Sequence, residues 1–199
     1  MTLIDHLIYA GLWFGFGAGH SLLAGATLRR LFGAGYRLAY NAIALVSLAA
    51  ILVIGRIGLA PGETVFDRPV WLQAAQVVLV VAGLAAGVFA LRGYDLGLLG
   101  GTAQWRAARN GTAIDDGDEA LHLDGLHRYV RHPLYAATFP ILWGLVDSEF
   151  ALATAIWASA YFWLGSRYEE RRLIARYGEA YRRYRTQVPA FVPWRGRAI

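Results

Sequence analysis

Four long segments of this 199-residue chain contain no Asp, Glu, Lys or Arg. They lie between His6 and Arg29, from Leu38 to Gly55, from Val70 to Leu91 and from Phe150 to Ser166. A helix that crosses a bilayer needs about 17–25 predominantly apolar residues. A helix buried in a soluble bundle normally keeps one polar face, and these segments have almost none. The pattern therefore predicts an all-α, polytopic integral membrane protein.

A fifth apolar segment, Leu134–Val146, has only thirteen residues and contains Pro140. At about 1.5 Å per residue it is shorter than the core of a bilayer. A polar turn at residues 147–149 separates it from the last long segment. We expect a helical hairpin whose first leg begins before Pro133 or does not fully cross the membrane.

The arginines indicate the orientation, because an excess of Lys and Arg marks the cytoplasmic side. They gather after the first segment, after the third, and in the tail from Arg167 onward, whereas residues 56–69 and 147–149 carry acidic side chains. This distribution predicts five spans with an outside N-terminus and a cytoplasmic C-terminus. The N-terminus lacks a basic region and a cleavage site, so residues 7–28 are expected to be a retained span. The excess of basic over acidic residues then reflects the membrane topology, and no nucleic-acid partner is expected.

Two polar segments on the cytoplasmic side could hold a ligand. They run from Arg92 to His132 and from Arg167 to the C-terminus. We therefore expect an N-terminal three-helix transmembrane region, residues 1–91, and a second region, residues 92–199, with a loop, the hairpin and an amphipathic helix. The glycines at 97–101 lack the context of a nucleotide fingerprint, which favours a flexible exit. The acids at 115–119 do not match an EF-hand, which favours a solvated turn, and no metal site is expected.

The joint before the short apolar segment is a candidate anion site. Pro133 disfavours helical geometry at His132 and suits the first position of the next helix. Arg131 and His132 should thus lie on an extended joint beside a helix N-terminus, where a carboxylate or a phosphate can bind. The alternative is that these side chains only anchor the chain in the headgroup layer.

The tail has an apolar face and an arginine-rich face. Leu173, Ile174 and Tyr177 begin an apolar series with three- and four-residue spacing, which continues at Tyr181 and Tyr184 and predicts an amphipathic helix. Its other face is rich in arginine, so a helix that lies on anionic lipid is one interpretation.

Two carboxylates lie close to the exit of the fifth span. Glu169 and Glu170 are costly there unless they are paired or solvated. They could pair with Arg131, Arg171 or Arg172, or they could bind a cationic ligand.

The joint and the tail, in this order, resemble the C-terminal signature of the isoprenylcysteine carboxyl methyltransferase and phospholipid methyltransferase superfamily. The matching residues are Gly125, Tyr129–Tyr135, Glu169-Glu170, Tyr177-Gly-x-x-Tyr181-x-x-Tyr184, Val188-Pro189 and Pro193. The N-terminal half resembles a narrower subgroup, the bacterial methanethiol S-methyltransferases and related denitrification-associated membrane proteins. The residues that carry this second resemblance are His20-Ser21, Tyr36-Arg37-x-x-Tyr40-Asn41 and Tyr94-Asp95-Leu96.

The resemblance implies a bacterial inner-membrane enzyme that takes its methyl group from S-adenosyl-L-methionine on the cytoplasmic side. It implies contact with membrane lipid and a small or lipophilic acceptor, such as a thiol, that enters from the bilayer. The cofactor-binding residues implied are Gly125, Tyr129, His132, Pro133, Leu134, Tyr135, Glu169, Glu170 and Tyr181. Nothing in the sequence indicates a prenylated protein tail as substrate, and His127 replaces the less charged turn of many relatives.

Methyl transfer to a thiol requires that the thiol first becomes a thiolate. It then depends mainly on in-line alignment of the nucleophile, the methyl group and the leaving sulfur, and on desolvation. Arg131 or Arg167 could stabilise the thiolate, and His20 or His132 could take its proton. His20 has a second interpretation as a satisfied polar residue inside the first span. Two other functions remain open. One is a membrane accessory protein without enzymatic activity, and the other is an NADPH-dependent membrane reductase of the sterol-reductase type.

Overall fold

The computed structural model describes residues 1–24, 26–112, 114, 121 and 123–195. The acidic stretch at 115–119 lies outside these described residues. The described part of the chain consists of helices and connecting loops and contains no strand, which confirms the expected all-α class. The chain forms two compact units, here called unit 1 (Met1–Gly62 and Tyr94–Glu119) and unit 2 (Glu63–Gly93 and Ala120–Ile199). The functional division expected at residue 91 stays a prediction, because these units are groups of packed segments.

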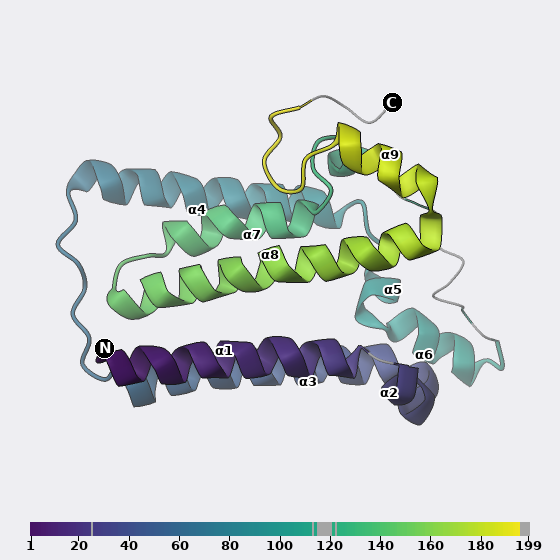
Figure 1. The fold of residues 1–199 in the computed structure, drawn as a ribbon, viewed down its shortest axis with the longest axis horizontal. Coiled ribbons are helices and arrows are strands. Elements are labelled where there is room, and N and C mark those ends of the chain that lie inside the picture. Colours follow the sequence, from purple (N-terminus) through teal and green to yellow (C-terminus); the bar gives the residue numbers. More distant parts are fainter. Residues whose placement is uncertain (25, 113, 115–120, 122, 196–199) are drawn as a thin grey trace. The chain divides into compact units, whose positions relative to one another are not determined.

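Unit 1 is built on two helices that pack side by side, α1 and α3 (Figure 1). Its elements are α1 (Leu3–Leu23), α2 (Ala26–Phe32), the 3₁₀ turn η1 (Gly33–Gly35), α3 (Tyr36–Val53), the π-helical turn η2 (Ile54–Leu59), α5 (Leu96–Gly100) and α6 (Thr102–Arg109). Thr2 begins α1 as the N-cap, because its hydroxyl accepts from Asp5 N while the Asp5 carboxylate accepts from Thr2 N.

The glycine cluster at the start of the loop forms a packed turn. Asp95 caps α5 at its N-terminus, and the Asn41 side chain donates to the carbonyls of Leu99 (3.0 Å) and Gly100 (3.2 Å) at its other end. Gly101 has φ +92°, and a Cβ there would lie 2.7 Å from Leu38 N. The expected flexible exit is therefore wrong, because only glycine allows this close approach to α3.

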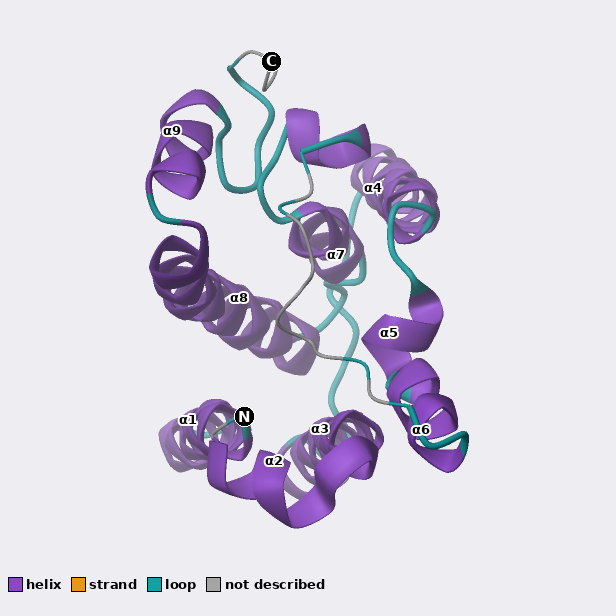
Figure 2. Cartoon of the chain, turned by 90° about the vertical axis from the view of Figure 1, so that its right-hand side faces the viewer, coloured by secondary structure: helices purple, strands orange, loops and turns teal. Residues whose placement is uncertain are grey.

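Unit 2 contains the hairpin and the tail. Its elements are α4 (Val70–Leu91), η3 (Gly125–Arg128), α7 (Pro133–Gly144), α8 (Glu149–Tyr177) and α9 (Glu179–Gln187). Figure 2 shows α7 between α4 and α8, with which it packs. The Ser148 hydroxyl caps α8 by accepting from Ala151 N at 3.3 Å, so the polar turn ends one leg of the hairpin and starts the next.

Helices α4 and α7 approach each other at backbone distance. A Cβ on Gly83 would lie 2.8 Å from Ala137 O, and one on Gly144 would lie 2.7 Å from Gln76 O. Small residues that let backbones touch are typical of helix contacts in membranes. Close packing against α4 therefore holds α7, the short leg of the hairpin, in place.

Two helical stretches, Arg29–Leu59 and α4, are long and apolar enough to cross a membrane. Only 11% and 17% of their apolar windows are buried, so they do not resemble core helices of a soluble protein. The other described helices do not meet both criteria: α7 has 12 residues, and α1 and α8 are long enough but less apolar. These features support a membrane protein, while the five spans and their orientation stay predictions.

The tail differs from the single amphipathic helix expected from its spacing. Residues up to Tyr177 continue α8 without a break, and Gly178 at φ +59° separates them from α9. Tyr181, Tyr184 and Val188 form a buried cluster against Leu173, Ile174 and Tyr177. The apolar face of α9 therefore packs on protein, and the interpretation that this face rests on lipid is wrong.

Candidate functional site

The site begins at the N-terminus of α7, where the backbone of His132 is outside the helical region, as Pro133 requires. His132 has φ −123° and ψ 72°, and Pro133 occupies the first turn of α7. The backbone N–H of Arg131 donates to Pro189 O at 2.9 Å, and that of His132 donates to Ala190 O at 3.1 Å. These two bonds attach the joint to the segment that follows α9.

Arg131 connects three parts of unit 2 through its guanidinium. Its Nε and Nη2 lie 2.8 and 2.6 Å from Oε1 of Glu170 on α8. Its Nη1 donates to the carbonyls of Arg185 (3.2 Å) and Val188. The Arg131 and Glu170 side chains are only 11% and 5% exposed, so each charge depends on the other for compensation.

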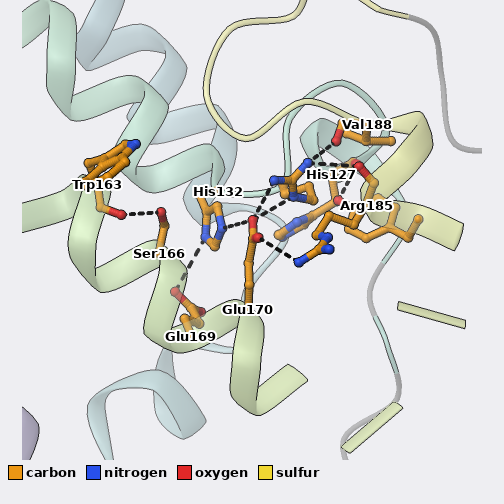
Figure 3. Close-up of polar contacts among 10 residues, drawn as sticks. His127, His132, Trp163, Ser166, Glu169, Glu170, Arg185 and Val188 are labelled. Atoms are coloured by element: carbon orange, nitrogen blue, oxygen red, sulfur yellow. Dashed lines mark hydrogen bonds and ion pairs between the residues drawn. The ribbon is translucent and has the colours of Figure 1, made fainter. Parts of the chain in front are cut away.

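His132 lies between the two glutamates of α8 (Figure 3). Its Nε2 is 3.2 Å from Glu170 Oε1, and its Nδ1 is 3.5 Å from Glu169 Oε2. Burial alone would lower the pKa of His132, but the hydrogen bonds and charges of both glutamates outweigh it and raise the pKa. Burial alone would raise the pKa of Glu170, but His132 and Arg131 together lower it. The cluster therefore favours a protonated His132 beside an ionised Glu170.

A cavity of about 450 Å³ lies against this cluster. It is lined by Arg131, Trp163, Ser166, Arg167, Glu170, Arg185, Ala190, Phe191 and Trp194. Three guanidinium groups and one carboxylate thus share a pocket with three aromatic rings. The Arg131–Glu170 pair leaves the lining with a net positive charge, which suits a ligand that carries a carboxylate or a phosphate.

Aromatic contacts support the wall of the cavity. Phe191 packs on His132 (5.7 Å between ring centroids) and on Phe139 (5.1 Å). Tyr135 stacks between His132 (5.5 Å) and Phe162 (4.9 Å). These rings connect α7, α8 and the segment after α9, so they hold the pocket in shape.

Three of the residues predicted from the sequence line the cavity: Arg131, Arg167 and Glu170. The predicted residues outside its lining are His20, Gly125, Tyr129, His132, Pro133, Leu134, Tyr135, Glu169 and Tyr181. Of these, His132 contacts Glu170 directly, and Glu169 and Tyr135 contact His132. The roles of the predicted residues in binding stay predictions.

Tyr181 has a structural position instead. It is 1% exposed in the cluster that joins α9 to α8, and burial raises the pKa of its hydroxyl. Its neighbour Tyr184 donates to His127 O at 2.7 Å, which attaches η3 to α9. This contact uses the backbone of His127, so it does not require a particular side chain there.

His20 lies in unit 1, whereas the cavity belongs to unit 2. Its Nε2 is hydrogen-bonded to the Tyr40 hydroxyl, and its ring stacks on Phe16 at 5.6 Å. Tyr36, from the same sequence motif as Tyr40, donates to Leu23 O at 2.8 Å. The motif residues of the N-terminal half thus join α1 to α3.

Sequence reasoning missed several lining residues, of which Trp163 and Ser166 had a usable signal. Trp163, Ser166 and Glu170 follow one another at three- and four-residue spacing, which places them on one face of α8. Arg185, Phe191 and Trp194 had no such signal, because their position depends on the fold of the tail back onto Arg131.

Known proteins similar to this chain share one activity. The chain is 36% identical over 74 residues to the methanethiol S-methyltransferase of Crocosphaera subtropica, a match that covers 36% of this chain and 28% of that protein. It is 36% identical over 70 residues to the methanethiol S-methyltransferase of Mycobacterium tuberculosis, covering 35% of this chain and 29% of that protein. The matches confirm the resemblance to this subgroup over a part of the chain. The matched part spans less than a third of the length of these curated relatives. No family model and no solved structure matches the chain.

Proposed function

We propose that this protein is an integral membrane methyltransferase that transfers a methyl group from S-adenosyl-L-methionine to a small thiol. The observation that carries the proposal is the similarity, at 35–36% identity over about 70 residues, to four methanethiol S-methyltransferases. The pocket in unit 2 supports it, because its side chains suit the separate parts of this methyl donor.

The cavity volume of about 450 Å³ falls in the range of small-molecule sites, about 300–1,000 Å³. Arg185, whose side chain is 47% exposed, can hold the carboxylate of the donor, since guanidinium groups bind carboxylates with strong, charge-assisted hydrogen bonds. Trp163, Phe191 and Trp194 offer ring faces to a purine and to a sulfonium cation. The donor, when bound, supplies an electrophilic methyl group on a positively charged sulfur.

The side chains of the protein then act mainly by position. The Arg131–Glu170–His132 network fixes the floor of the pocket, and the rings of Phe191 and Trp163 keep water from the reacting atoms. Positioning and desolvation supply most of the acceleration that a methyl transfer needs.

The acceptor enters from the bilayer. The uncharged part of α8 ends at Ser166, and Arg167 is the first charged residue that follows. Trp163, Ser166 and Arg167 all line the cavity, so the pocket lies at the boundary between apolar and charged chain. An apolar thiol can therefore reach the cavity from lipid while a charged donor reaches it from the cytoplasm of a bacterial cell.

A reductase that uses NADPH is the second candidate. The three guanidinium groups of the lining favour it, because a 2′-phosphate binds well to arginine. A membrane accessory protein without activity would bind neither cofactor.

Isothermal titration of the detergent-purified protein with S-adenosylhomocysteine and with NADPH separates these functions. We expect S-adenosylhomocysteine to bind with one site per chain and NADPH not to bind. The matched variants are Arg185→Gln in the lining, which should weaken binding, and Arg182→Gln on the exposed face of α9, which should not. Binding of NADPH alone would favour the reductase, and binding of neither would favour the accessory protein.

A further inference from the structure

The three arginines that line the cavity differ in how far other groups already use them. Arg131 is hydrogen-bonded to Glu170, Arg185 O and Val188 O and is largely buried. Arg185 lies 4.0 Å from the second oxygen of Glu170. Arg131 is therefore part of the network that shapes the pocket, whereas Arg185 is half-exposed and is the arginine that the proposed function assigns to the donor carboxylate.

Arg167 is different. Among the residues that the structure describes, none forms a hydrogen bond or an ion pair with its guanidinium. The guanidinium lies over the ring of Trp163, 5.1 Å from the centroid, and both residues are exposed to the cavity. A guanidinium stacked on an aromatic face is held in place while its N–H donors stay available to a ligand.

Ser166 and Glu170, the other polar side chains of the lining, cannot offer free hydrogen-bond donors to an anionic ligand. The Ser166 hydroxyl donates to Trp163 O at 2.8 Å, and Ser166 is buried. Glu170 is negative, but Arg131 and His132 compensate its charge. With Arg131 used by the network and Arg185 assigned to the donor carboxylate, Arg167 is, among the described residues that line the cavity, the cation left to pair with a thiolate.

We propose that Arg167 is the catalytic residue that stabilises the thiolate form of the acceptor, an inference that rests on the proposed function. The thiol loses its proton to water before the transfer, and the guanidinium pairs with the sulfur anion. The sulfur then forms a bond to the methyl carbon of the donor, the bond from that carbon to the donor sulfur breaks, and its electron pair stays on the donor sulfur. The products are a neutral thioether and S-adenosylhomocysteine.

The test compares the pH dependence of kcat/KM for two thiols in the wild type and in Arg167→Gln. A nearby cation lowers the pKa of an acidic group by about 1–3 units. An alkyl thiol, whose pKa is near or above that of cysteine at about 8.5, should therefore lose about 10- to 1,000-fold at pH 7 in Arg167→Gln. The loss should shrink as the pH rises, and an aromatic thiol that is already ionised at pH 7 should lose much less. Arg167→Lys should restore part of the rate with the alkyl thiol.

The matched control is Arg171→Gln. Arg171 lies one turn further along α8 and stacks on Tyr168 at 5.5 Å in the same way, but it does not line the cavity. Its pH profile should equal that of the wild type, and all variants should keep their affinity for S-adenosylhomocysteine. Equal losses for both thiols, or an unchanged pH profile in Arg167→Gln, would overturn the assignment of Arg167. A wild type that binds S-adenosylhomocysteine but methylates no thiol would overturn the proposed function as well.

Discussion

Arg131 and Glu170 form a buried ion pair across 39 positions of sequence. The sequence indicated that Glu169 and Glu170 need partners and offered three arginines, of which Arg131 is the one that Glu170 contacts. Helical spacing could not select it, because periodicity reports only neighbours on one helix. The partner depends on the N-terminus of α7 lying beside the last turns of α8, which is a tertiary contact.

Arg131→Gln should destabilise the protein strongly, because it leaves Glu170 buried without a compensating charge. Loss of one partner of such a pair costs about 3–5 kcal/mol. Chemical unfolding in detergent measures this loss. Arg182→Gln breaks an exposed pair with Glu179 (3.6 Å) and should cost at most about 1 kcal/mol. Similar losses in the two variants would contradict the burial of the Arg131–Glu170 pair.

His132 should make the stability of unit 2 depend on pH. Its folded pKa is raised above the ordinary 6.5, so its contribution is complete below pH 6.5 and is lost as the pH rises through the folded value. The folded pKa of Glu170 is lowered from 4.5, so its contribution is present above pH 4.5 and is lost as the pH falls through the folded value. Thermal unfolding between pH 5 and 9 should show an alkaline decline that His132→Gln reduces. The same decline in both proteins would show that His132 does not hold a proton in this cluster.

Among the helices, the extent of the segments without charged residues predicted the long ones well. The segment from Val70 to Leu91 is α4 itself, and a non-helical joint at His132 precedes α7, which begins at Pro133 as expected. The break at Gly178 was missed because the spacing from Tyr177 to Tyr181 and Tyr184 remains helical across it. The direction of α9 is set by the positive φ of one glycine, which an apolar pattern does not report.

The contact between α4 and α7 gives a test at this scale. Gly83→Ala should destabilise the protein by about 1–3 kcal/mol, because the new Cβ would meet the Ala137 carbonyl at 2.8 Å and overpacking has this cost. Gly87→Ala, one turn along the same helix, places its Cβ 3.8 Å from that of Ala137, which is an ordinary contact. Unfolding of both variants in detergent measures the difference. Equal stability of the two variants would mean that α4 and α7 are not closely packed at Gly83.

At the scale of the whole molecule, the membrane topology rests on the arginine distribution. The chain has no cysteine, so single cysteines can report the side of each loop. A cysteine at Thr64 should react with an impermeant maleimide in intact cells, and one at Gln187 should react only after permeabilisation. Both positions are exposed in the structure. Labelling of Gln187→Cys in intact cells would contradict the cytoplasmic C-terminus.

Transfer of a labelled methyl group measures the proposed methylation of a thiol directly. Purified protein in detergent or lipid discs is supplied with methyl-labelled S-adenosyl-L-methionine and methanethiol, and the volatile products are analysed by mass spectrometry. We expect labelled dimethyl sulfide to form in proportion to enzyme, with much less from Arg167→Gln at pH 7 and an undiminished amount from Arg171→Gln. Protein that is folded and binds S-adenosylhomocysteine, yet forms no labelled thioether from methanethiol or a longer thiol, would show that the protein is not a thiol methyltransferase.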